Sequence, residues 1–87
     1  MTKARVIIKE HEILWATLEK IAKDRKKSMS ALATSIGLDP TAFGKSKRIE
    51  NGVYRMPTMT TILALLRVHN ISWYDWANIW YKIEKQY

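Results

Sequence analysis

The chain has 87 residues, no cysteine and a formal net charge of +7. A chain of this length has room for one domain that buries about 60–65% of its unfolded surface, and the lack of cysteine excludes disulfides and thiolate metal sites. Because there is no apolar run of about 18 residues and no signal-peptide pattern, we expect a soluble intracellular protein without a membrane segment.

The positive charge is concentrated in the first two-thirds of the chain. Residues 1–55 hold 12 of the 15 Lys and Arg and 6 of the 8 Asp and Glu, a balance of +6 that leaves +1 for residues 56–87. Such an asymmetry favours a polyanionic partner for the first part of the chain. Solvated basic surfaces are also common, so charge alone does not identify nucleic acid.

Residues 1–9 are expected to be an N-terminal arm or an extension of the first helix. Lys3 and Arg5 could follow a DNA groove, although a frayed terminus has the same composition. The β-branched run 6–8 suits a short strand or a helix start, and we favour the helix.

Residues 10–87 are predicted to form a single domain, which begins with a helix over residues 10–26. The apolar stripe of this helix has helical spacing and consists of Leu14, Leu18, Ile21 and Ala22, with Trp15 at its edge. The run 24–27 ends the helix with cations, which suit the negative end of the helix dipole. The same cations precede the next motif and could contact phosphate.

Residues 28–48 have the pattern of a helix-turn-helix. Ser28 can cap a first helix, whose buried face follows, and Gly37 can end it in the left-handed conformation. Asp39 can cap a second helix that carries Pro40 in its first turn. Phe43 is its only large apolar residue and should point inward, which leaves the neighbouring polar and basic side chains exposed. Two helices, a glycine turn and a basic second helix describe a DNA-binding unit.

The remaining chain predicts a turn and two further helices. Asn51-Gly52 marks the turn, and Arg55 is placed where it can contact phosphate or remain solvated. The fourth helix follows a cap at Met56 or Thr58 and ends near residues 69–70. The last helix, residues 72–86, begins with a capping box and is rich in tryptophan. The expected fold is all-α, with five short helices and no strand.

An enzymatic function is not expected. His11 and His69 are far apart in the sequence, and the acidic residues show no metal-ligand or paired-carboxylate spacing. No glycine-rich phosphate loop is present. The sequence therefore predicts no catalytic residue, no metal and no cofactor.

The motif resembles a known family. The pattern Leu32-Ala33-x-x-Ile36-Gly37-Leu38, followed by residues 39–43, is similar to the Cro/cI-type helix-turn-helix of the xenobiotic-response-element regulators. LDPTAFGKSKR is especially similar to the N-terminal DNA-binding domain of phage-repressor-like proteins, whose peptidase domain has no counterpart here. The resemblance covers roughly residues 11–80 and implies a five-helix, lambda-repressor-like domain whose second and third helices form the helix-turn-helix.

The resemblance also implies a set of DNA contacts. The residues expected to face bases are Thr41, Ala42, Gly44 and Lys45. The residues expected to contact phosphate, from the resemblance or from charge and position, are Lys27, Ser28, Lys47, Arg48 and Arg55. Lysine and threonine reach base-edge acceptors, whereas phosphate contacts set the register and the salt-dependent affinity.

The sequence departs from the family pattern at three places. Met29 stands where the family usually has a phosphate-contacting Gln. Gly44 offers no side chain for readout and costs a helix about 1 kcal/mol relative to Ala. The Glu50-Asn51-Gly52 turn arrives some three residues late, which implies a longer recognition helix or a longer loop after it.

The tryptophan-rich helix suggests a homodimer. An aromatic stripe is usually core, but aromatic residues are also enriched at interfaces. The residues considered for this interface are Trp73, Trp76, Trp80 and Tyr87. The expected function is a sequence-specific double-stranded DNA-binding regulator, a repressor that acts as a dimer on a palindromic operator, in the cytoplasm of a bacterium or encoded by a phage. The alternatives are a protein-interaction module on the same fold and a non-specific nucleic-acid binder.

Overall fold

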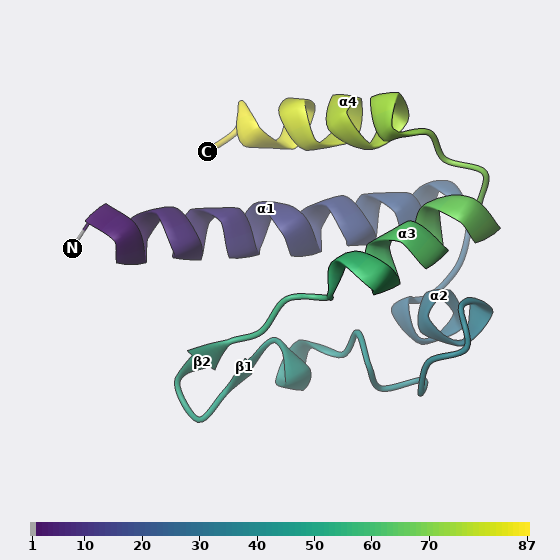
Figure 1. Cartoon of the computed structure of the whole chain (residues 1–87), viewed down its shortest axis with the longest axis horizontal. Helices are drawn as coiled ribbons and strands as arrows, with labels where there is room; N and C mark the ends of the chain where they lie inside the picture. Colours follow the sequence, from purple (N-terminus) through teal and green to yellow (C-terminus); the bar gives the residue numbers. More distant parts are fainter. Residues whose placement is uncertain (1) are drawn as a thin grey trace.

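The computed structural model describes the backbone of residues 2–87 and the side chains of residues 9–87. These residues form four α-helices, a 3-10 turn and a short antiparallel hairpin (Figure 1). The elements are α1 (Thr2–Asp24), α2 (Met29–Ser35), η1 (Lys45–Lys47), β1 (Ile49–Glu50), β2 (Val53–Tyr54), α3 (Met59–Val68) and α4 (Trp73–Glu84). The chain is therefore mostly helical, but the predictions of five helices and of no strand are wrong.

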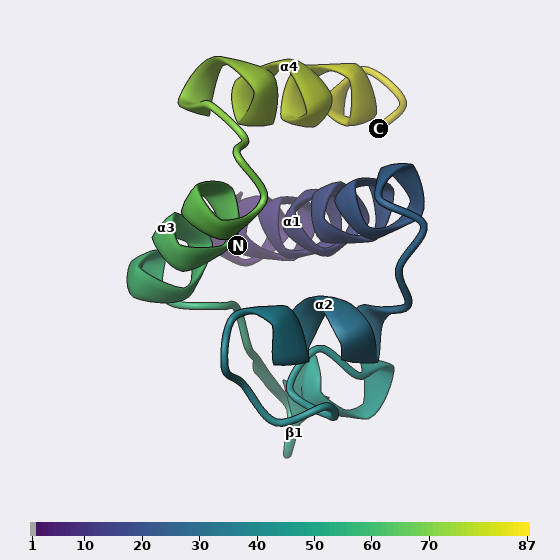
Figure 2. The same ribbon diagram turned by 90° about the vertical axis from the view of Figure 1, so that its right-hand side faces the viewer.

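Helix α1 lies between two parts of the molecule. Figures 1 and 2 show α4 on one side of α1, with α3 next to α1, and α2, η1 and the hairpin on the side opposite α4. We call residues 29–54 on that opposite side the α2 layer. The core is formed by the buried faces of these helices and by Phe43, and its fully buried side chains include Ile13, Leu18, Ile21, Leu32 and Leu65.

Three helices begin at the predicted caps. The hydroxyl groups of Ser28 and Thr58 accept hydrogen bonds from the amides three residues later, at 3.1 and 3.2 Å. Ser72 accepts from the amide of Asp75 at 3.0 Å, and the Asp75 carboxylate accepts from the amide of Ser72 at 3.4 Å. These side chains satisfy amides that have no partner inside the helix. The capping box predicted for the last helix is thereby confirmed.

Three helices end in the same way, with a residue of positive φ. Gly37 (φ 81°) and Asn70 (φ 54°) confirm the predicted ends of α2 and α3, and Lys26 (φ 58°) ends α1. In each case the next amide bonds a carbonyl five residues back, as Lys27 does to Ala22 at 2.9 Å. The amide of the positive-φ residue itself bonds the carbonyl three residues back. Together the two bonds form the Schellman motif, in which glycine is the favoured residue at the positive-φ position. Lysine adopts the left-handed conformation less readily because of its Cβ.

The second helix of the predicted helix-turn-helix is absent. We call residues 39–48 the recognition segment; it consists of successive tight turns. The amides of Ala42 and Gly44 bond the carbonyls of Asp39 and Thr41, three residues back, at 2.9 Å each. Gly44 then adopts an extended conformation (φ −69°, ψ 151°), which separates these turns from η1. The helix-propensity cost expected for Gly44 therefore does not arise.

The predicted Asn51-Gly52 turn is confirmed, and it closes a hairpin. Ile49 pairs with Tyr54, and Glu50 pairs with Val53. Asn51 (φ 53°) and Gly52 (φ 77°) are both left-handed, which is the backbone of a two-residue type I′ turn. The turn at residues 50–52, which comes some three residues later than in the family pattern, is thus part of a hairpin that follows the recognition segment.

The predicted N-terminal arm is part of α1, which begins at Thr2. Residues 2–9 therefore continue the helix backbone. The side chains of Lys3 and Arg5 lie outside the described residues, and so does their predicted contact with a DNA groove.

We predict that Lys26→Gly raises the free energy of unfolding by about 0.5–1 kcal/mol, because glycine removes the Cβ strain at the end of α1. Urea denaturation followed by circular dichroism measures this change. Lys27→Gly is the matched control, since it removes the same charge at a position of ordinary φ and should not stabilise. Equal effects of the two substitutions would contradict the prediction.

Candidate nucleic-acid interface

The connection between α1 and α2 places two cations at the edge of the α2 layer. Lys26 and Lys27 are exposed and follow directly on the end of α1. Ser28 is also exposed, but its hydroxyl oxygen is used as the cap of α2. The cap uses Ser28 only as an acceptor, so its O–H could still donate to a phosphate, and the predicted contacts of Ser28 and Lys27 are both compatible with the cap.

The recognition segment opens with a hydrogen-bonded turn. Thr41 donates its hydroxyl to the carboxylate of Asp39 at 2.6 Å and its amide to the same oxygen at 2.9 Å. These bonds hold the pKa of Asp39 below its ordinary value, the side-chain bond having the larger effect. Because the proton of the Thr41 hydroxyl is committed to Asp39, the exposed oxygen can only accept a further hydrogen bond.

The four predicted base-contact residues differ in what they present to solvent. Thr41 and Lys45 are exposed, and each carries a functional group. Ala42 is half-buried and packs against the core, and Gly44 has no side chain. Of the four predicted base-contact residues, only Thr41 and Lys45 therefore present a polar side chain to solvent, with exposed Lys47 beside them.

Arg48 points inward. Its guanidinium pairs with Glu19 at 3.0 Å, lies 4.6 Å from the centroid of the Trp15 ring and donates to the carbonyl of Phe43 at 3.3 Å. Its side chain is only 14% exposed. The phosphate contact predicted for Arg48 is therefore not available without breaking these interactions, and the residue instead ties the recognition segment to α1.

Arg55 follows the second strand and is exposed. Its guanidinium lies 3.8 Å from the carboxylate of Glu50 across the hairpin, a weak surface pair. Its amide donates to the carbonyl of Arg48 at 2.8 Å, which closes the base of the hairpin. The exposed side chain is compatible both with the predicted phosphate contact and with a solvated arginine.

His11 and Trp15, one turn apart on α1, hold both ends of the hairpin. His11 Nε2 lies 2.9 Å from the carbonyl of Arg48, and Trp15 Nε1 lies 3.1 Å from the carbonyl of Arg55. The two ring nitrogens are also 3.2 Å apart. The assignment that satisfies both carbonyls has each ring nitrogen donating to its own carbonyl. Sequence analysis assigned no such role to either residue, because the partner carbonyls are about 40 positions away.

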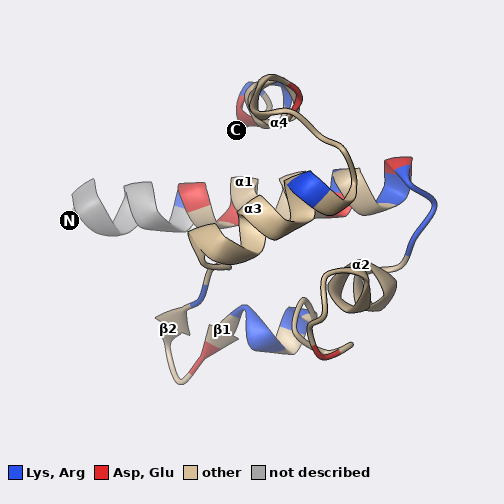
Figure 3. Ribbon diagram, turned by 45° about the vertical axis from the view of Figure 1, so that its right-hand side comes forward, with Lys and Arg blue, Asp and Glu red and all other residues tan. Residues whose placement is uncertain are grey.

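Lysine and arginine gather at three places on the α2 layer and its borders. Figure 3 shows the α1–α2 connection, the η1 turn and the end of the hairpin in blue. Among the described residues Lys26, Lys27, Lys45 and Lys47 have no salt-bridge partner. These cations are free to meet an external anion.

The tryptophan-rich helix α4 divides its aromatic residues between core and surface. Trp76 is 8% exposed and belongs to the core, and Trp80 is half-buried against it. Trp73 and Tyr87 are exposed, as are Tyr74 (79%) and Tyr81 (56%). Of the predicted interface residues, Trp76 thus serves the core of its own chain. The outward face of α4 adds Tyr74 and Tyr81, which sequence analysis did not select.

Metal-binding clusters and membrane-spanning helices are both absent from residues 9–87. In that part of the chain, no group of three or more His, Asp or Glu side chains is placed to hold a metal ion. No helix in it has the length and apolar character needed to cross a membrane.

Comparison of the chain with protein-family models, with curated proteins and with solved structures finds no match.

We predict that Trp15→Phe lowers the free energy of unfolding by about 1–3 kcal/mol. The substitution keeps an aromatic ring beside Arg48 but leaves the carbonyl of Arg55 without its donor. Urea denaturation measures the loss, and amide hydrogen exchange should show faster exchange in the hairpin than in α3. Trp73→Phe, at an exposed position, is the control and should change stability by less than about 0.5 kcal/mol. Equal losses in both variants would contradict the role given to Trp15.

Proposed function

We propose that this chain is a sequence-specific double-stranded DNA-binding regulator that acts as a repressor. The observation that carries the proposal is the recognition segment, which follows the glycine turn of α2 and presents Thr41, Lys45 and Lys47 to solvent. The resemblance of the same residues to the Cro/cI-type motif supports it. The segment enters the major groove as a pair of tight turns instead of an α-helix.

The exposed groups of the segment match the chemistry of base edges. The ammonium of Lys45 can donate to the N7 and O6 acceptors of guanine. The Thr41 oxygen, whose proton is held by Asp39, can accept from the amino group of adenine or cytosine. These two side chains would supply direct readout.

The other free cations would contact the DNA backbone. Lys47 lies within the segment, Lys26 and Lys27 precede α2, and Arg55 ends the hairpin. Phosphate contacts by such cations fix the register of a protein on DNA and make its affinity fall with salt. Arg48 has a different role, because it positions the segment from inside through Glu19.

Selection from a random duplex library at two salt concentrations tests this function. An enriched inverted repeat is expected, with a half-site spacing of about one helical turn, ~34 Å. Binding without enrichment that vanishes as salt rises would favour the non-specific alternative. Absence of binding at low salt would leave the protein-interaction alternative, for which the exposed face of α4 is the surface to test.

We predict that Lys45→Ala relaxes selectivity at one base position by about 1–3 kcal/mol, because a direct base contact is lost. Lys47→Gln should weaken all sequences alike and reduce the salt slope by about one, because a phosphate contact is lost. Fluorescence anisotropy on the selected site and on single-base variants measures both effects. Arg67→Gln, which removes one charge at an exposed position of α3, should leave affinity and selectivity unchanged. A uniform loss in Lys45→Ala would contradict direct readout.

The proposed regulator acts as a homodimer through the outward face of α4. Tyr74 and Tyr81 are seven residues apart, so they lie on one face of the helix, and Ala77 between them is exposed as well. Together with Trp73 they form an apolar surface of the kind enriched at interfaces. A second copy would bury this surface and supply a second recognition segment, one for each half of a palindromic site.

We predict that Tyr74→Glu/Tyr81→Glu abolishes dimerisation, because it places charges in the buried interface without touching the core. Sedimentation velocity, with and without the selected DNA, should find wild-type dimers and variant monomers. Met59→Glu is the control, an exposed apolar position on α3. A wild-type chain that stays monomeric at high micromolar concentration, free and on DNA, would refute the dimer.

A further inference from the structure

A groove runs between α1 and the second half of α4. It has a volume of about 660 Å³ and is bordered by Ala16 and three lysines, with Ile79, Ile83 and Tyr87 on the α4 side. The volume lies within the roughly 300–1,000 Å³ typical of small-molecule sites. The groove is thus large enough for a ligand with an apolar part.

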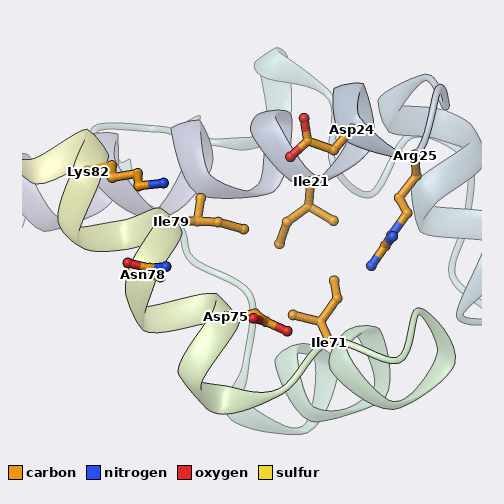
Figure 4. Close-up of a pocket in the computed structure, with 8 residues that line it drawn as sticks. All are labelled: Ile21, Asp24, Arg25, Ile71, Asp75, Asn78, Ile79 and Lys82. Atoms are coloured by element: carbon orange, nitrogen blue, oxygen red, sulfur yellow. The ribbon is translucent and has the colours of Figure 1, made fainter.

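The groove continues into a smaller pocket of about 240 Å³ at the other end of α4. Figure 4 shows Ile21, Ile71 and Ile79 pointing toward one another in this pocket, with charged side chains around them. Asp24, Ile79 and Lys82 line both cavities. The small pocket has two acids, Asp24 and Asp75, and two cations, Arg25 and Lys82.

The larger groove has three lysines and two acids. Its two acids are already engaged, because Glu19 pairs with Arg48 at 3.0 Å and Asp24 pairs with Lys20 at 3.1 Å. Within the described part of the chain, Lys23 and Lys82 have no salt-bridge partner. The groove therefore combines two uncompensated ammonium groups, one from each helix, with an apolar wall.

We propose that this groove binds a small amphiphilic anion, with one acidic head group and an apolar chain. The ammonium groups of Lys23 and Lys82 hold the head group, since a charge-assisted hydrogen bond is stronger than a neutral one. The chain lies along Ile83 and Ile79, where its burial is favourable. This binding does not depend on the proposed DNA function.

Titration of the ¹⁵N-labelled full chain with sodium decanoate, below its micelle concentration, tests the proposal by NMR. Saturable shifts are expected at the amides of α1 and α4 that border the groove. Affinity should rise about fourfold for each methylene added between hexanoate and decanoate. The neutral alcohol 1-decanol should bind at least about tenfold more weakly, because it lacks the charge.

Charge-matched variants separate the groove from general attraction. Lys23→Gln/Lys82→Gln should weaken decanoate binding at least about tenfold. Lys85→Gln/Lys27→Gln removes the same charge outside the groove and should change affinity less than about twofold. All four side chains are exposed, so the fold is retained, which circular dichroism checks. Equal losses in the two variants, equal binding of decanol, or no saturation would overturn the proposal.

Discussion

The hydrogen bonds from His11 and Trp15 to the carbonyls of Arg48 and Arg55 are the interaction on which the α2 layer depends. They join α1 to both ends of a hairpin whose own strands are only two residues long. A hairpin of that size is marginal in water without support. Because the donors lie on a buried helix face, loss of the Trp15 bond would leave the Arg55 carbonyl without its protein donor, whereas the Arg48 carbonyl would keep the bond from the Arg55 amide. The recognition segment ends at Arg48, whose carbonyl accepts the bond from His11.

Helix α1 connects the two sides of the molecule. Glu19 borders the groove next to α4 and also pairs with Arg48. Arg48 in turn bonds the carbonyl of Phe43, whose ring is 3% exposed and meets Trp15 edge-on at 5.9 Å. The recognition segment is thus held from beneath by an aromatic anchor and an arginine, while its lysines stay on the surface. Lys47 and Arg48 are adjacent in the sequence, but the Lys47 side chain faces solvent whereas that of Arg48 points inward.

The features that the sequence predicted are those set by short-range chemistry. The caps at Ser28, Thr58 and Ser72, the left-handed Gly37 and the Asn51-Gly52 turn each depend on a few neighbouring residues. The state of residues 39–48 was not predictable in this way, because an α-helix and successive 3-10 turns have similar local patterns. The inward direction of the Arg48 side chain depends on Glu19 and Trp15 of α1, about 30 residues earlier in the sequence. The division of α4 between core and surface likewise depends on packing, since its aromatic residues surround much of the helix.

The hairpin is closed at its base, by the bond from the Arg55 amide to the Arg48 carbonyl and by the two side chains of α1. Tyr54 still packs edge-on against His11 at 5.0 Å, but Asn51 and Gly52 are exposed at the tip of the hairpin, and the entropy of closing a longer loop grows only slowly with its length. Insertions between Asn51 and Gly52 should shift neither helix nor recognition segment. This site therefore offers a place to attach a fluorophore or an epitope tag.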